Sequence, residues 1–182
     1  MSLLGQLKGH VARFDARVDR YVDGLRSRPG LDRVMYLASE LGDHSLVWHL
    51  LGTAQALRPG RRPESAVRAA VILGVESALV NGVVKSAFRR GRPVWESEEP
   101  RPFRLRTPRT SSFPSGHASS ALTAAGILAP GDPLAPVYYA VAGLVGSSRV
   151  YVKIHHASDV VAGALLGVAL ARAANRLWPP IR

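Results

Sequence analysis

The sequence contains no cysteine, so neither a disulfide nor a metal site built from thiolates can stabilise the fold. It is also short of acidic residues, with 13 Asp and Glu against 24 Lys and Arg and a formal net charge of +11. This balance predicts an acidic partner: nucleic acid, an anionic membrane surface or a phosphorylated substrate. Residues 1–19 lack the apolar core of about 7 to 15 residues that a secretory signal requires, so we expect no cleaved signal.

Long apolar runs argue against nucleic acid as the partner. Residues 70–84, 134–148 and 160–171 are apolar on nearly all sides, which is typical of buried or lipid-facing helices. Modules that bind nucleic acid carry their charge on a polar or aromatic-studded face instead. We therefore expect no nucleic acid partner and place the chain in a membrane. Its length of 182 residues predicts a single domain over residues 1–182.

The N-terminal segment has a different pattern. Apolar residues recur at spacings of three and four between positions 3 and 25, ending before a turn at Ser27–Gly30. Residues 1–30 therefore predict an amphipathic helix that lies at the membrane interface. An ordinary helix of a bundle or dimer would show the same pattern.

Five further helical segments are expected at about 33–57, 66–88, 115–129, 134–148 and 157–174. The predicted fold is all-α: a membrane bundle of about five spanning helices over residues 33–175, preceded by the interfacial helix. Several segments have only 15 to 18 residues, about 22 to 27 Å of helix against a hydrocarbon core of about 30 Å, so a soluble bundle stays open. Gly163 and Gly167 would allow close helix packing, and Glu76 should face the interior.

Three stretches carry residues suited to phosphoryl transfer. Lys85, Arg92 and Arg149 are cations that could hold phosphate oxygens, and the start of a helix at Ser115 and Gly116 would add backbone N–H groups. Two histidines can divide the acid and base or nucleophile roles. Asp159 follows His155 by four residues, which on one face of a helix would let the carboxylate hold the imidazole. The second histidine is His117.

The order Lys-x6-Arg-Pro (85–93), Pro-Ser-Gly-His (114–117) and Ser-Arg-x5-His-x3-Asp (148–159) resembles the signature of the type 2 phosphatidic acid phosphatase superfamily. This family includes lipid phosphate phosphatases and the vanadium haloperoxidases. The resemblance implies a phosphohistidine at His155, which Asp159 orients, and a general acid at His117. It also implies phosphoryl binding by five residues: Lys85, Arg92, Ser115, Gly116 and Arg149. No metal or other cofactor is expected.

Other interpretations of these residues stay open. His117, His155 and Asp159 could form a zinc site, although nearby cations would oppose a divalent metal. His10, His44, His49 and His156 are expected to be surface or satisfied polar groups. The arginines between residues 89 and 109 are expected to form a solvated or headgroup-facing run. The alternative functions are a vanadate-dependent haloperoxidase and a basic membrane-surface adaptor without catalysis.

The expected substrate is a lipid phosphate in the cell membrane: a phosphatidate, a phosphatidylglycerophosphate, a polyprenyl diphosphate or a polyprenyl-phosphosugar phosphate. If five segments span, 17 of the 24 Lys and Arg residues lie on the side of the motifs. By the positive-inside rule, the active site of this multi-pass protein is then expected on the cytoplasmic face.

Overall fold

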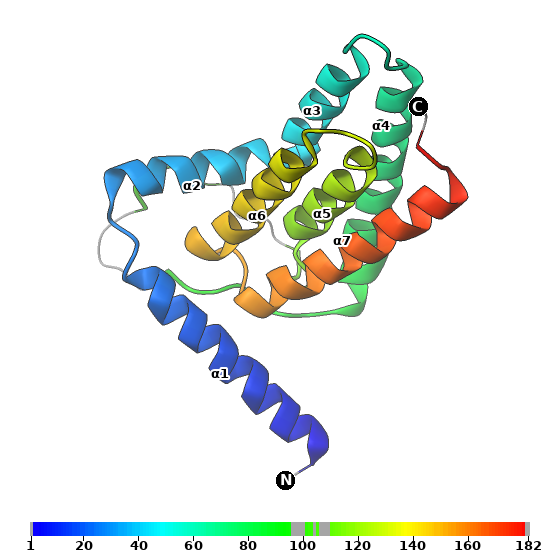
Figure 1. Ribbon diagram of the computed structural model, residues 1–182. Coiled ribbons are helices and arrows are strands. Elements are labelled where there is room, and N and C mark those ends of the chain that lie inside the picture. Colours follow the sequence, from blue (N-terminus) through cyan, green and yellow to red (C-terminus); the bar gives the residue numbers. More distant parts are fainter. Residues whose placement is uncertain (1, 96–100, 104, 106–109, 181–182) are drawn as a thin grey trace.

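The computed structural model is entirely helical over the residues that it describes, which are 2–95, 101–103, 105 and 110–180. The α-helices in these ranges are α1 (Leu3–Asp23), α2 (Pro29–Leu41), α3 (Leu46–Ala56), α4 (Glu64–Ser77), α5 (Gly116–Leu128), α6 (Ala135–Tyr151) and α7 (Ala157–Leu177). A π-helical stretch (Ala78–Val84) and a 3-10 turn (Lys85–Ala87) continue α4. The arrangement confirms the predicted all-α fold (Figure 1).

Helix α5 forms the centre of the bundle, in contact with α4, α6 and α7. It is rich in Ala, Ser and Gly, so neighbouring helices approach it closely. On α7, a Cβ at Gly163 would lie 2.3 Å from Ser115 O, and one at Gly167 would lie 2.3 Å from Ser119 O. Any larger residue would clash at both positions. The close packing predicted from these two glycines is therefore confirmed.

The outer faces of the bundle are apolar. Val67, Val71, Val75 and Leu79 are exposed along one side of α4 and its continuation, at a spacing of four that places them in one stripe. Within the described residues, the helices Glu64–Ala87 and Ala157–Leu177 are long and apolar enough to cross a membrane. An exposed apolar surface of this kind is typical of a lipid-facing protein.

The segment expected as one helix over 33–57 is in fact two, and that prediction was wrong. Helix α2 ends at Leu41, and α3 begins at Leu46 after a turn in which His44 and Ser45 have φ angles of 52° and 58°. Left-handed backbone interrupts a helix. The turn carries Asp43, which lines the cavity described below.

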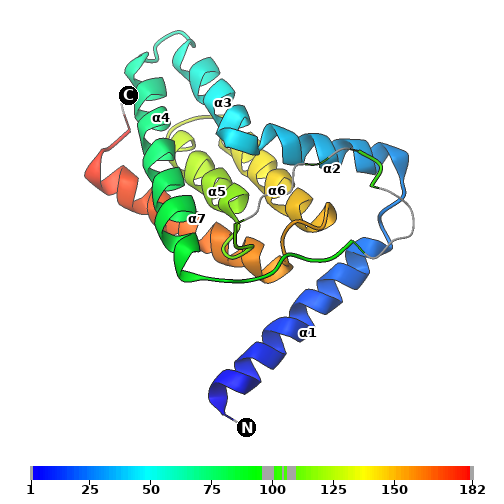
Figure 2. The same cartoon turned by 180° about the vertical axis from the view of Figure 1, so that it is seen from behind.

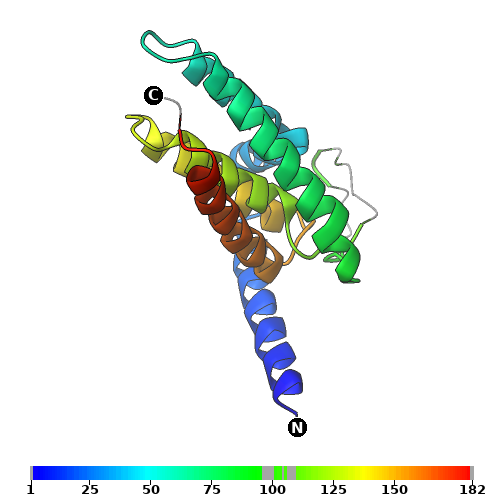
Figure 3. The same cartoon turned by 90° about the vertical axis from the view of Figure 1, so that its right-hand side faces the viewer.

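Helix α1 projects from the body of the molecule, at the end opposite the α3–α4 connection (Figure 3). Its apolar side chains Leu3, Leu7, Val11 and Phe14 are exposed. They lie on one side of the helix at spacings of four, four and three. The helix predicted for the N-terminus is confirmed, and its position at a membrane interface stays a prediction.

Seen from behind, the chain that leaves α4 runs beneath the bundle toward α1 and α2 (Figure 2). Its described part contacts both regions: Arg90 binds Asp15 of α1 and Phe103 packs against Tyr36 of α2. The arginines expected as a solvated run include Arg104, Arg106 and Arg109, which lie outside the described residues. Arg90 and Arg101 do not fit that expectation, because both bind protein groups.

Candidate active site

The three motifs meet at one end of the bundle. Lys85 begins the 3-10 turn that ends the continuation of α4, and Arg92 lies in the loop after it. Ser115 caps α5, Arg149 lies in the last turn of α6, and Asp159 lies in the first turn of α7. The Ser115 amide donates to the Asp159 carbonyl at 3.0 Å, which ties the second motif to the third.

A cavity of about 830 Å³ opens at this point. Six of the eight site residues expected from the sequence line it: Lys85, Arg92, Gly116, His117, Arg149 and His155. Ser115 and Asp159 do not line the cavity and are fully buried. The structure therefore brings all three motifs to one site, with six residues facing the cavity and two supporting them.

The cavity is suited to an anion. Lys85, Arg92 and Arg149 place three cationic side chains on its wall, and Arg149 is only 2% exposed. Two nitrogens of Arg92 are held by backbone, with Nη1 donating to Ile154 O at 2.9 Å and Nη2 to Thr110 O at 3.1 Å. Helix α5 begins at Gly116, which lines the cavity, and the first N–H groups of a helix can bind an anion.

His155 is buried, at 2% exposure, in the turn between α6 and α7. Burial lowers its pKa to about 3, and the charges of Arg149, Arg92 and Lys85 act in the same direction, while Asp159 opposes them. The imidazole is therefore neutral near pH 7. A neutral imidazole has a free electron pair for attack on phosphorus.

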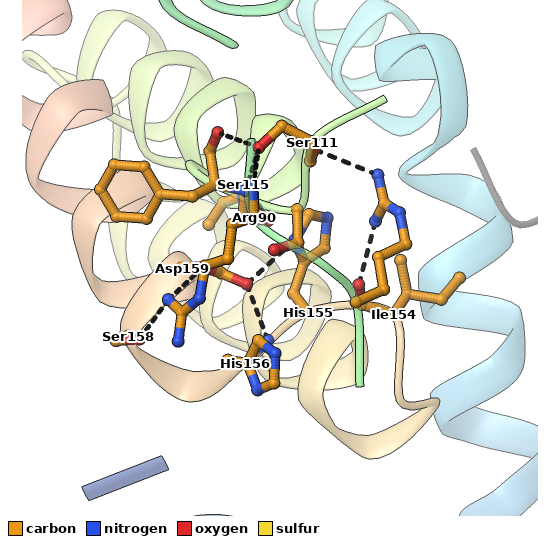
Figure 4. A network of polar contacts seen from close by, with 12 residues as sticks. Arg90, Ser111, Ser115, Ile154, His155, His156, Ser158 and Asp159 are labelled. Atoms are coloured by element: carbon orange, nitrogen blue, oxygen red, sulfur yellow. Dashed lines mark hydrogen bonds and ion pairs between the residues drawn. The ribbon is translucent and has the colours of Figure 1, made fainter. Parts of the chain in front are cut away.

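The pairing of His155 with Asp159 was predicted on a wrong local structure. Helix α7 begins at Ala157, so His155 precedes the helix instead of sharing a face of it with Asp159. The two still approach, with His155 Nδ1 at 3.7 Å from Asp159 Oδ2 (Figure 4). This distance exceeds a hydrogen bond, and it would hold an ion pair only when the imidazole is protonated.

His156 is the N-cap residue of α7. Its backbone N–H donates to Asp159 Oδ2 at 2.9 Å, and it is not among the residues that line the cavity. His155 lines the cavity, so the geometry favours it over its neighbour. Among the described residues, no group of three or more His, Cys, Asp or Glu side chains is arranged to hold a metal ion.

Asp43 is a site residue that sequence reasoning missed. Its Oδ1 lies 2.8 Å from Nε2 of His117, and it lines the same cavity. Burial alone would raise the pKa of Asp43, but contact with His117 and the charge of Arg149 bring it below its usual value. The carboxylate is thus ionised at neutral pH. The turn at Gly42-Asp43-His44-Ser45 was itself missed, because the sequence was interpreted as one helix over 33–57; the glycine followed by Asp, His and Ser is the local signal that could have indicated it.

Other cavity residues were also not assigned a role. His44 and His49 are exposed, as expected. Together with Ser77 and Asn81 they also line the cavity wall beside the three cations. Glu76 is buried, as expected, and faces the same cavity as Lys85. No ion pair of Glu76 is found among the described residues, and its Oε1 atom has no hydrogen-bond partner there.

Comparisons with known proteins agree with this site. A family model for the PAP2 superfamily matches residues 65–181. Decaprenylphosphoryl-5-phosphoribose phosphatase of Mycolicibacterium smegmatis is 35% identical over 76% of this chain and 74% of that protein. The protein of the same name from Mycobacterium tuberculosis is 32% identical over 90% of this chain and 87% of that protein.

Two solved structures are similar across most of the chain. A transmembrane PAP2-type phosphatidylglycerolphosphate phosphatase from Bacillus subtilis aligns with a TM-score of 0.71 and 25% identity, covering 95% of this chain and 88% of that one. LpxE of Aquifex aeolicus aligns with a TM-score of 0.69 and 26% identity, covering 88% and 94%. Because the family model spans more than half of the chain and these relatives are phosphatases, the chain belongs to the PAP2 superfamily and is a phosphatase.

Proposed function

We propose that this enzyme removes the terminal phosphate from a polyprenyl-phosphosugar phosphate, through a phosphohistidine at His155 and without a metal ion. The observation that carries the proposal is the convergence of three cations and two histidines on one cavity. Lys85, Arg92 and Arg149 hold the phosphoryl oxygens together with the N–H groups at the start of α5. These charges also stabilise the negative charge of the transition state.

The proposed reaction has two steps. The Nε2 atom of His155 attacks phosphorus, because Nδ1 faces Asp159. The bond between phosphorus and the sugar oxygen breaks, and His117 gives its proton to that oxygen. Water then attacks the phosphohistidine while His117 takes a proton from it, which releases inorganic phosphate and restores both histidines.

Asp43 supports His117 in both steps. A general acid must carry its proton when substrate binds, yet Lys85 and Arg149 line the same cavity and oppose a positive imidazole. The Asp43 carboxylate at 2.8 Å favours the protonated form. We therefore assign Asp43 as a positioning residue that also favours the protonated form of the acid.

The choice among lipid phosphates rests on the relatives and on the cavity wall. Both mycobacterial relatives are named for a substrate that joins a polyprenyl phosphate to a phosphoribose. The wall of this cavity carries His49, Ser77 and Asn81 beside the cations, and these side chains can bond sugar hydroxyls. The apolar stripe on α4 would face the polyprenyl chain in the membrane.

The test is phosphate release by the purified protein in detergent, measured as kcat/KM. The panel is a polyprenylphosphoryl-phosphoribose, a phosphatidate, a phosphatidylglycerophosphate and a polyprenyl diphosphate. We expect the highest value for the first lipid and an acid-labile phosphoryl group trapped on His155. Higher kcat/KM for a glycerolipid would overturn the substrate assignment. Trapping of the same group in His155→Ala would overturn the mechanism.

A further inference from the structure

One carboxylate of the N-terminal helix is buried although the helix around it is exposed. Asp15 is 7% exposed, whereas the preceding Phe14 is 44% exposed. A buried carboxylate is costly unless charged or polar donors compensate it. Asp15 accepts hydrogen bonds from Ser158 N and Ser158 Oγ, each at 2.8 Å, and from Arg90 Nη2 at 2.7 Å. Helix α1 is therefore bound directly to the start of α7.

The guanidinium of Arg90 connects Asp15 to the active site. Its Nη2 binds Asp15, and its Nη1 donates to Asp159 Oδ1 at 2.6 Å and to Ser158 Oγ at 2.8 Å. Figure 4 shows Arg90 between Ser158 and Asp159, with the other side of Asp159 turned toward His155 and His156. One guanidinium thus joins two carboxylates that come from opposite ends of the chain.

The two carboxylate oxygens of Asp159 have different partners in this arrangement. Arg90 occupies Oδ1, so Oδ2 is the oxygen that faces Nδ1 of His155 at 3.7 Å. We propose that Asp15 is a positioning residue of the phosphatase, which acts on the His155–Asp159 pair through Arg90. The proposal rests on the function proposed above for His155 and Asp159.

Two physical effects give Asp15 this role. Asp15 anchors Nη2 of Arg90. A guanidinium that is held at both Nη atoms fixes the orientation of the carboxylate that it binds. Asp15 also balances the charge of Arg90. Without Asp15, that charge would act on Asp159 alone and weaken the carboxylate's support of a positive imidazole during phosphoryl transfer. Loss of either effect lowers kcat, while the residues proposed to bind phosphate are untouched.

Asp19 supplies a matched control on the same helix. It lies one turn beyond Asp15 and also binds the body of the protein, through Lys153 Nζ at 3.1 Å and Arg26 Nη2 at 3.4 Å. In the contacts of the described residues it reaches neither Arg90 nor Asp159. Asp19→Asn therefore weakens the attachment of α1 without changing the contacts of the active site.

The experiment compares Asp15→Asn, Asp19→Asn, Arg90→Gln and the double variant Asp15→Asn/Arg90→Gln, each as the full chain in detergent. We expect Asp15→Asn to lower kcat about tenfold with KM within about twofold of wild type, an effect of the size found for coupled neighbours. Asp19→Asn should retain wild-type kcat. In the Arg90→Gln background, Asp15→Asn should lower kcat by less than about twofold, because the connection is already broken.

Two outcomes would overturn the role of Asp15: equal kcat in Asp15→Asn and Asp19→Asn, or losses that multiply in the double variant. Thermal unfolding of each variant identifies a loss of fold, and the comparison between the two single Asp variants holds even if Arg90→Gln does not fold. His155→Ala is assayed in parallel. Full activity in that variant would overturn the proposed function, whereas the outcomes above concern Asp15 alone.

Discussion

The Nε2 atom of His117 lies 2.8 Å from the Oδ1 atom of Asp43. His117 is in the first turn of α5, and Asp43 is in the short turn between α2 and α3. The backbone before Asp43 is held against the same ring, because a Cβ at Gly42 would lie 2.7 Å from His117 Cδ2. The α2–α3 turn is therefore built around the proposed general acid.

Asp43→Asn should lower kcat about tenfold with little change in KM, since an amide does not stabilise a positive imidazole as a carboxylate does. Because the proton on His117 is then lost more easily, the alkaline limb of the kcat profile should move to lower pH. The measurement is phosphate release from pH 5 to 9. Glu40→Gln removes an exposed carboxylate near the same turn and should leave the profile unchanged. An unshifted alkaline limb in Asp43→Asn would contradict the role given to Asp43.

The histidines should differ in their effects. His155→Ala should abolish turnover because it removes the proposed nucleophile. His117→Ala should slow the reaction by about 10² to 10⁴, and least for substrates with a good leaving group, which need no proton. His156→Ala should retain most activity because His156 contacts Asp159 through its backbone N–H. An inactive His156→Ala beside an active His155→Ala, both folded, would show that the nucleophile is misassigned.

Vanadate should inhibit competitively, because three cations and the α5 N–H groups suit a bipyramidal oxyanion. Treatment with EDTA should leave phosphate release unchanged, since the cations of the cavity neutralise the substrate without a divalent ion. Both are measured with the purified protein and one lipid substrate. Loss of activity in EDTA that zinc or magnesium restores would refute the metal-independent reaction.

Gly163→Ala should destabilise the protein by about 1 to 3 kcal/mol, because the added methyl group would overlap the carbonyl of Ser115. It should also lower activity, since Ser115 caps the helix that we propose binds phosphate. Gly143→Ala is the control. A Cβ at Gly143 meets no atom within 4 Å, so its unfolding temperature should be unchanged or slightly higher. Thermal unfolding in detergent compares the two variants. Equal unfolding temperatures would show that α7 can move away from α5 without a loss of stability.

The cytoplasmic position of the active site stays a prediction of the charge distribution. The chain has no cysteine, so single cysteines can be introduced at Val94, which is exposed beside the site, and at Glu64, at the start of α4. In intact cells, a membrane-impermeant reagent should label Glu64→Cys and not Val94→Cys. Labelling of Val94→Cys from outside would reverse the orientation.

Patterns within short stretches of sequence determined most of the fold and the motif residues. Helix positions follow from apolar runs and from the turns that interrupt them, because both depend on neighbouring residues. The motif spacing identified eight site residues, and six of them line one cavity. The break after Leu41 was missed because its neighbours are apolar enough to continue a helix, while the left-handed backbone at His44 and Ser45 is visible only in the structure.

Tertiary structure alone decided which residues support those motifs. Asp43 reaches His117, and Asp15 reaches Asp159 through Arg90, across elements that are distant in the chain. In the sequence, these residues look like ordinary charged positions in a segment expected as one helix over 33–57, an amphipathic helix and an arginine-rich loop. Their roles depend on burial and on distances between helices. Such distances are set by the packing of the whole bundle, which no local pattern of residues encodes.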